Sequence, residues 1–298
     1  MFKKYKKYIW VIVAALAVSD AVWGFYPNRT VRYAVFAGYN GDGTIHPYVI
    51  TYLKGLKEVS DGVVYVADST LNPEEEKKLK DLTIHYENVR HEEYDWGSYK
   101  RGFNWLKDNG YLDKADEVIF ANDSCYAPIT GFKPMFETMD RRKDLDFWGA
   151  LQNTRFTPHV QSYFMVLRKN VLQSRQFQHF INGVRHQPDS SLYITEYEVK
   201  LTPYLHDYGY KWDSFIPYQK LAYLPDSEKN SYPLALIKDY GYQFIKRRIF
   251  KNSLMMYENE AELLRYVYQL NPTLYQEIAT EIPERFIPDD LKEKTNAH

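Results

Sequence analysis

Three polar side chains follow directly after a hydrophobic run that is typical of a buried strand. Residues 117–121 (EVIFA) form the run, and Asn122, Asp123 and Ser124 come next. Such oxygen donors suit Mg²⁺ or Mn²⁺ bound jointly with a diphosphate, and the ion would neutralise charge on a departing nucleotide diphosphate. We therefore expect Asp123 to be catalytic and to bind a divalent cation, with Asn122 and Ser124 on the nucleotide donor. A turn or a helix cap is the structural alternative for this triplet.

Two further segments combine polar and aromatic residues at positions where a strand ends or a helix begins. Tyr39 lies in a turn after residues 31–38, and residues 92–100 (EEYDWGSYK) lead into a helix. Asp95 offers a hydrogen-bond acceptor to a ribose or a base, Tyr99 offers a stacking surface, and Lys100 ends the segment. We predict that all four bind the donor, while a helix cap and core packing are the alternatives for this segment.

Two acids stand two residues apart in a helical pattern. Glu196 and Glu198 cannot share one helix face at this spacing. Leu201 and Leu205 follow Glu198 at positions three and seven, which would seat the Glu198 face on the core. An enzyme that transfers a group with inversion needs a carboxylate as general base, so we expect Glu198 to be catalytic. A solvated helix face is the alternative for both acids.

Two groups of residues offer contacts to an acceptor or a phosphate. His159 and Gln161 precede a hydrophobic strand, and Lys246 and Arg247 lie in a cluster that is basic and apolar. A loop histidine and an exposed helix face are the structural alternatives. The basic cluster would also suit an anionic lipid surface.

The elements that must position these residues alternate between strand and helix. The expected strands span 31–38, 62–67, 82–86, 117–121, 146–150 and 163–167, and the expected helices span 49–56, 96–107, 192–208 and 258–270, with another that begins at 72. This alternation predicts a mostly parallel α/β sheet with helices on both faces and a helical C-terminal appendage. Ligands bind at the carboxyl ends of such strands, which is where the three polar segments lie.

The chain divides by pattern into four parts. Residues 1–30 are basic and apolar, and we expect 31–150 to form a nucleotide-sugar-binding half, 151–250 an acceptor-binding half and 251–298 a helical extension. The formal charge of −1 gives no electrostatic case for nucleic-acid binding. The single cysteine, Cys125, excludes an intrachain disulfide and a zinc site built on several thiolates.

The N-terminus leaves three alternatives open. Lys3, Lys4, Lys6 and Lys7 precede a mostly apolar stretch, whose uninterrupted part, 8–18, is too short for a clear membrane span. A signal peptide, an interfacial or single-pass anchor and a buried helix all fit this pattern. We expect the anchor, which would hold the protein at the cytoplasmic face of the cell membrane.

Several of these motifs resemble the rhamnan synthesis protein F family of bacterial polysaccharide glycosyltransferases, from about residue 31 to residue 250. The most specific match is residues 120–128 (FANDSCYAP), where Ala127 replaces a common Gly. The stretches YDWGSYK (94–100), DFWG (146–149), HVQSYF (159–164) and YEVKLT (197–202) also match, with Lys200 in place of an expected Gly.

The resemblance implies a GT-A-like fold, with residues 122–124 at the position of that fold's metal-binding acidic motif. Ser124 stands where the motif has its second acid. Glu198 is similar to the acid that serves as base in inverting enzymes. The resemblance further implies a donor such as dTDP-rhamnose or a UDP-sugar, and a glycan or lipid-linked glycan acceptor.

Two other functions fit the same residues. A glycoside hydrolase would need two acids about 5–10 Å apart around a sugar. A non-catalytic carbohydrate-binding subunit of a polysaccharide assembly would bind sugar without turnover.

Overall fold

The computed structural model describes residues 29–224, 228–251 and 258–295. The chain divides into two compact units, 1–31 and 32–298, and the second holds every element below. The anchor predicted for residues 1–30 lies almost wholly outside the described residues. Within the described residues, no helix is both long and apolar enough to cross a membrane.

A seven-stranded sheet forms the centre of the larger unit, in the order β10-β6-β9-β4-β1-β2-β3. The strands are β1 (Arg32–Gly38), β2 (Gly62–Ala67), β3 (His85–Asn88), β4 (Glu117–Asn122), β6 (Phe147–Gly149), β9 (Phe164–Arg168) and β10 (Trp212–Ser214). Strand β9 runs antiparallel to β4 and β6, and the other neighbouring pairs are parallel. The predicted mostly parallel sheet is therefore confirmed.

Two short antiparallel pairs lie outside the main sheet. Strand β5 (Cys125–Tyr126) pairs with β11 (Ile245–Lys246), and β7 (Gln152–Asn153) pairs with β8 (His159–Val160). The first pair joins the segment after β4 to a segment about 120 residues later in the chain.

Helices and helical turns connect the strands. The α-helices are α2 (Pro47–Lys57), α3 (Pro73–Leu79), α4 (Tyr94–Asp108), α5 (Lys133–Met139), α6 (Lys169–Leu172), α7 (Arg175–Asn182), α8 (Ser190–Tyr193), α9 (Val199–Asp207), α10 (Pro233–Tyr240), α11 (Glu260–Leu270), α12 (Pro272–Ala279) and α13 (Asp289–Thr295). A π-helical turn, Ile194–Glu198, joins α8 to α9.

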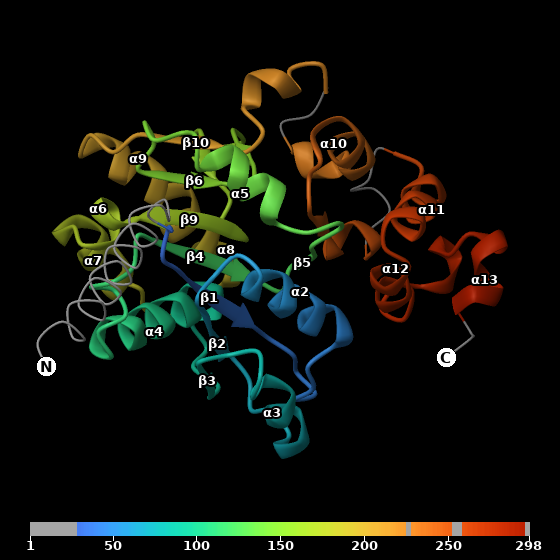
Figure 1. The fold of residues 1–298 in the computed structure, drawn as a ribbon, viewed down its shortest axis with the longest axis horizontal. Helices are drawn as coiled ribbons and strands as arrows, with labels where there is room; N and C mark the ends of the chain where they lie inside the picture. The colour runs from blue at the N-terminus through green and yellow to red at the C-terminus, as the bar shows by residue number, and fades with distance from the viewer. Residues whose placement is uncertain (1–28, 225–227, 252–257, 296–298) are drawn as a thin grey trace, which may run out of the picture. The chain divides into compact units, whose positions relative to one another are not determined.

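Helices cover both faces of the sheet, on either side of β1 in Figure 1. On one face, Phe103 of α4 meets Phe177 of α7 with ring centroids 5.2 Å apart, and Phe177 also meets Phe120 of β4. On the other face, Phe36 of β1 packs edge-on against Tyr52 of α2. Adjacent strand residues point to opposite faces, so each strand contributes to both cores.

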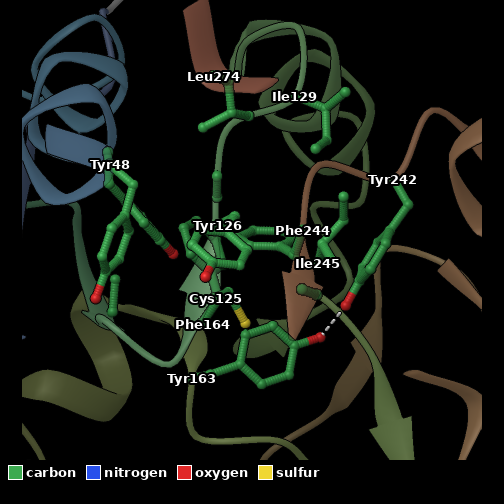
Figure 2. Packing of buried hydrophobic residues seen from close by; sticks show 14 of the residues in the cluster. Tyr48, Cys125, Tyr126, Ile129, Tyr163, Phe164, Tyr242, Phe244, Ile245 and Leu274 are labelled. Carbon is green, nitrogen blue, oxygen red and sulfur yellow. Dashed lines mark hydrogen bonds between the residues drawn. The ribbon is translucent and has the colours of Figure 1, made fainter. Parts of the chain in front are cut away.

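The second core continues under the β5–β11 pair, as Figure 2 shows. Tyr163 and Tyr242 share a buried hydroxyl–hydroxyl hydrogen bond there. Tyr126, Phe244 and Leu274 are nearly fully buried in the same cluster, so α12 packs into the core that supports β5 and β11.

Some expected boundaries and roles differ from the structure. Strand β3 begins at His85, three residues after the predicted start, because Leu82 and Thr83 close the turn that ends α3. Asn72 precedes α3, but its side chain donates to the Asp42 carbonyl instead of accepting a helix N–H. Near the C-terminus, an ion pair between Asp290 and Arg265 ties α13 to α11.

Gly102 permits the close approach of α4 to β1. A Cβ at this position would lie 2.3 Å from Cγ1 of Val35, far inside van der Waals contact. We predict that Gly102→Ala lowers the free energy of unfolding by about 1–2 kcal/mol, because the clash outweighs the helix propensity that alanine adds. Urea denaturation measures this change. Lys107→Ala on the exposed side of α4 is the control, and equal stability of the two variants would contradict the packing argument.

Candidate active site

A cavity of about 520 Å³ opens at the carboxyl ends of the central strands. This size lies within the range of about 300–1,000 Å³ that is usual for small-molecule sites. Its wall includes many of the predicted site residues, namely Asp95, Asn122, Asp123, Ser124, Gln161, Glu198, Lys246 and Arg247. The fold therefore brings together segments that are distant in the sequence, from Asp95 to Arg247.

Asp123 follows β4 and is anchored by main-chain groups. The Tyr39 amide donates to Asp123 Oδ2 at 2.8 Å, and the Asp123 amide donates to the Ala37 carbonyl. These bonds link the ends of β1 and β4. Burial raises the pKa of Asp123 above its ordinary value, although the Tyr39 bond and the charge of Arg247 oppose this rise.

Tyr39 takes part in the site through its main chain. Its ring is half exposed, with the Arg90 guanidinium 5.3 Å from the ring centroid, and it is not part of the cavity wall. The Tyr39 amide thus orients Asp123. A contact between Tyr39 and the donor stays a prediction.

Asp95 lies in the first turn of α4 and points into the cavity. Its Oδ2 accepts a hydrogen bond of 2.6 Å from Nδ2 of Asn122. Burial, with the nearby charge of Asp123 as the next contribution, raises the pKa of Asp95 to about 7. Such a shifted carboxyl in a cleft is typical of functional sites.

The loop before α4 is fixed by a residue that the sequence did not reveal. Buried Asp68, just after β2, accepts hydrogen bonds from the amides of His91, Glu92 and Tyr94 at 2.8, 2.8 and 3.1 Å. Glu92 and Tyr94 have positive φ angles of 58° and 52°, which are uncommon for residues other than glycine. The Asp68 contacts compensate for this conformation and thereby position Asp95. Its place at a strand end was the available signal.

Glu198 faces the cavity as its helical spacing predicts, whereas Glu196 is exposed and pairs with Lys200. The amide of Ser162 donates to Glu198 Oε2 at 2.9 Å, and the Ser162 hydroxyl donates to the same oxygen. Burial would raise the pKa of Glu198, but hydrogen bonds from His159 and Ser162 and the charge of Lys246 hold it below its ordinary value. Glu198 is therefore ionised at neutral pH.

His159 lies behind Glu198 and does not line the cavity. Its Nε2 is 3.8 Å from Glu198 Oε1, and its Nδ1 lies 2.6 Å from the Thr157 carbonyl. Burial lowers the pKa of His159, but the contacts with Glu198 and Thr157 leave it raised overall. The imidazole is thus placed to support the Glu198 charge, which differs from the acceptor or phosphate contact that we expected.

The basic segment reaches the cavity through the β5–β11 pair. Lys246 lies opposite Cys125 in the ladder, and the Arg247 amide donates to the Ser124 carbonyl at 3.0 Å. Arg248, which belongs to the same basic and apolar cluster in the sequence, also lines the cavity, as does Lys251. Lys251 was not predicted, and its place just after this cluster was the available signal.

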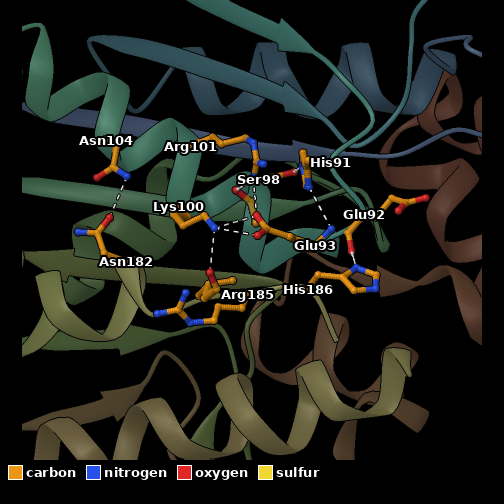
Figure 3. Close-up of polar contacts among 12 residues, drawn as sticks. His91, Glu92, Glu93, Ser98, Lys100, Arg101, Asn104, Asn182, Arg185 and His186 are labelled. Atoms are coloured by element: carbon orange, nitrogen blue, oxygen red, sulfur yellow. Dashed lines mark hydrogen bonds and ion pairs between the residues drawn. The ribbon is translucent and has the colours of Figure 1, made fainter. Parts of the chain in front are cut away.

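Tyr99 and Lys100 lie outside the cavity wall. Tyr99 is fully buried and its hydroxyl donates to the Ser162 carbonyl at 2.7 Å, so it supports the loop that holds Glu198. Lys100 belongs to a polar network on the outer side of α4, where it contacts Glu93 and the Val184 carbonyl (Figure 3). Tyr99 shares a helix face with Asp95 but lies one turn further along α4, in the core beneath Ser162, whereas Lys100, five positions after Asp95, points to a different face.

The residues around Asp123 fit a divalent cation poorly. Across the residues that the structure describes, no three His, Cys, Asp or Glu side chains come together as metal ligands. Asn122 Oδ1 is occupied by the amide and hydroxyl of Ser124, at 3.1 and 2.6 Å, and the Ser124 oxygen accepts from Lys246. The cavity therefore offers the expected oxygen donors, but internal hydrogen bonds and cations already engage most of them.

Comparison with known proteins identifies one family and several distant relatives. The family model described as rhamnan synthesis protein F matches residues 63–278. Virulence protein VirA of Vibrio anguillarum is 25% identical over 296 residues, which covers 92% of this chain and 91% of that protein.

The similar solved structures are more remote. Core-mannan synthase A from Aspergillus fumigatus, in a Mn/GDP form, has 11% identity and a TM-score of 0.34, over 53% of this chain and 64% of that one. A cytidylyltransferase from Leptospira borgpetersenii has 11% identity and a TM-score of 0.37, over 61% and 74%.

We predict that Asp95→Asn stabilises the protein increasingly as the pH rises. The folded-state pKa of about 7 exceeds that of an unfolded aspartate, about 4, so the folded protein binds the extra proton and loses stability between these pH values. Asparagine does not titrate, so the variant does not lose this stability as the pH rises. The difference in unfolding free energy between Asp95→Asn and the wild type should therefore be roughly 1–3 kcal/mol more favourable to the variant at pH 8 than at pH 5.

Urea denaturation at both pH values measures this difference. Asp81→Asn, at an exposed position outside the cavity, is the matched control. An Asp95→Asn effect that is the same at pH 5 and pH 8 would refute the raised pKa.

Proposed function

Because the chain belongs to the rhamnan synthesis protein F family, we propose that it transfers a sugar from a nucleotide-sugar donor to a growing cell-surface polysaccharide or lipid-linked glycan. The donor in this proposal is dTDP-rhamnose or a UDP-sugar, and transfer inverts the anomeric centre. The observation that carries the proposal is that one cavity is lined both by Glu198, whose pKa is held below its ordinary value, and by the strand-end acid Asp123.

Glu198 acts as general base in this proposal. The acceptor hydroxyl attacks the anomeric carbon, its proton passes to Glu198, and the bond from the sugar to the diphosphate breaks. The contacts from Ser162 and His159 keep Glu198 ionised, but they also weaken it as a base. The proton must therefore move late, when bond formation has made the hydroxyl acidic.

The donor occupies the side of the cavity formed by Asp95 and residues 122–124. Asp123 is fixed by the Tyr39 amide at the ends of two parallel strands, which is where ligands bind in open α/β sheets. A divalent cation held by Asp123 would supply Lewis-acid stabilisation of the leaving diphosphate.

We predict that Glu198→Gln lowers kcat by about 10²–10⁴-fold while the donor Kd changes little, because the variant keeps the shape and loses the base. The measurement is transfer of labelled sugar from a panel of dTDP-, UDP- and GDP-sugars to a glycan acceptor. Glu196→Gln, on the exposed side of the same turn, should retain wild-type rates.

Two outcomes would refute this assignment. Equal loss of donor binding in Glu198→Gln would make Glu198 a donor-site or structural residue. Release of sugar from a glycan by the wild-type enzyme in the absence of any nucleotide would indicate a glycoside hydrolase.

We also propose that the basic N-terminus holds the enzyme at the cytoplasmic face of the cell membrane, where a nucleotide-sugar donor is available. Lys3, Lys4, Lys6 and Lys7 would contribute about 1 kcal/mol each near an anionic surface. Full-length protein should therefore sediment with anionic vesicles, and replacement of the four lysines by glutamine should release it. Digestion of the catalytic unit by external protease in intact cells would contradict this location.

A further inference from the structure

A cluster of basic side chains lines the cavity, and the transfer step described above gives it no role. Lys246, Arg247, Arg248 and Lys251 all line it. We infer that this basic cluster, and not a divalent metal ion, binds the diphosphate of the donor and neutralises the charge that develops when the donor bond breaks. The inference rests on the proposed function, and it names the group that supplies the positive charge.

Lys246 lies closest to the motif where a metal ion is expected. Its Nζ donates to Ser124 Oγ at 3.2 Å and lies 3.9 Å from the centroid of the Tyr163 ring. The ammonium group thus stands beside the residue that replaces the second acid of a metal-binding motif. A divalent ion placed next to it would be repelled, whereas a phosphate oxygen would be attracted.

Arg247 is fixed as a charged wall of the cavity. Its guanidinium lies 4.7 Å from the Tyr48 ring centroid, and its Nη1 and Nη2 contact the Asp123 carbonyl and Glu281 at 3.3 and 3.4 Å. Its buried Nε donates to no group in the described part of the chain. A fixed, partly unsatisfied guanidinium suits an anionic ligand, because little conformational entropy is lost on binding.

Arg248 supplies a more exposed guanidinium on the cavity wall. Its Nη2 lies 2.8 Å from Glu228, and its side chain is 46% exposed. Such a group can turn toward an entering diphosphate without the cost of uncovering a buried charge. Lys246 and Arg248 together carry as much positive charge as one divalent ion.

The acidic side of the cavity leads to the same conclusion. Asp123 Oδ2 accepts from Tyr39, and Asp95 accepts from Asn122. A metal ion would have to compete with these bonds and with the neighbouring cations. A diphosphate is attracted instead, because it carries two or more negative charges and the cavity wall carries positive ones.

The chemical step balances without a metal ion. The acceptor oxygen bonds to the anomeric carbon, its proton goes to Glu198, and the electron pair of the broken bond stays on the terminal phosphate oxygen of the nucleotide. Lys246 and the arginines donate hydrogen bonds to the phosphate oxygens as this charge develops. Charge-assisted hydrogen bonds of this kind stabilise the transition state without a bound metal ion.

The test measures diphosphate binding by the full chain when divalent ions are absent. Inorganic pyrophosphate is the probe, with EDTA or Mn²⁺ in parallel titrations followed by calorimetry. We expect wild-type protein to bind pyrophosphate in EDTA, and Lys246→Met and Arg248→Gln each to weaken binding by about ten- to a hundredfold. Lys246→Arg should restore much of the affinity, because it keeps the charge.

Lys107→Met is the matched control, since it removes one positive charge from the exposed side of α4 and should bind pyrophosphate like the wild type. Thermal unfolding of each variant shows whether it is folded. Binding that disappears in EDTA and returns with Mn²⁺, or that is unchanged in a folded Lys246→Met, would overturn the inference.

The transfer assay separates this inference from the proposed function. Sugar transfer that continues in EDTA supports both, and transfer that requires Mn²⁺ refutes the inference alone. Pyrophosphate binding in EDTA without transfer from any nucleotide sugar would refute the proposed function while the diphosphate site stands.

Discussion

Placing Asp95, Asp123 and Glu198 in one cavity costs free energy, because each carboxylate loses water and repels the other two. The rest of the site is arranged to offset this cost. Asp123 accepts from the Tyr39 amide, Asp95 from the side-chain amide of Asn122, and Glu198 from the Ser162 amide, with the His159 imidazole also beside Glu198. Two of these partners, the Tyr39 and Ser162 amides, belong to the main chain, so they are in place before any ligand arrives.

The largest part of the compensating charge comes from a distant segment. The β5–β11 pair sets Lys246 opposite Cys125, and the buried aromatic core in Figure 2 supports both strands. Glu281, which follows α12, then contacts Arg247 and His46. The C-terminal helices of this glycosyltransferase are therefore part of the active-site framework, because they fix the guanidinium that faces Asp123.

The sequence predicted the framework well because its signals were local. A hydrophobic run that ends in Asn122-Asp123-Ser124 indicates a strand end in a parallel sheet, and the spacing of Leu201 and Leu205 oriented Glu198 correctly. The family resemblance is confirmed by the match over residues 63–278. The strand end and the orientation of Glu198 could be predicted because each depends on the residue pattern within one element, which the sequence records directly.

The contacts that could not be predicted join elements that are far apart. The spacing of residues 94–100 shows that Tyr99 and Lys100 point in different directions, because a one-residue step rotates a helix by about 100°. It does not show that Tyr99 meets the Ser162 carbonyl and Lys100 meets Glu93, since these contacts depend on how α4 packs. The ion pair of His159 with Glu198 depends on how a strand pair and a helix dock. Asp68 escaped notice since its partners are main-chain amides, which carry no sequence signal.

The pKa values of Glu198 and Asp95 are shifted in opposite directions, and this difference follows from what each carboxylate faces. Glu198 accepts hydrogen bonds from Ser162 and His159 and stays ionised. Asp95 is buried and lies near Asp123, and these two effects raise its pKa to about 7. Environments that push the pKa values of neighbouring acids apart commonly separate their chemical roles. Near neutral pH, Glu198 is thus the acid that is dependably available to accept a proton. A partly protonated Asp95 can bind a donor hydroxyl or phosphate oxygen beside Asp123 without adding a full negative charge.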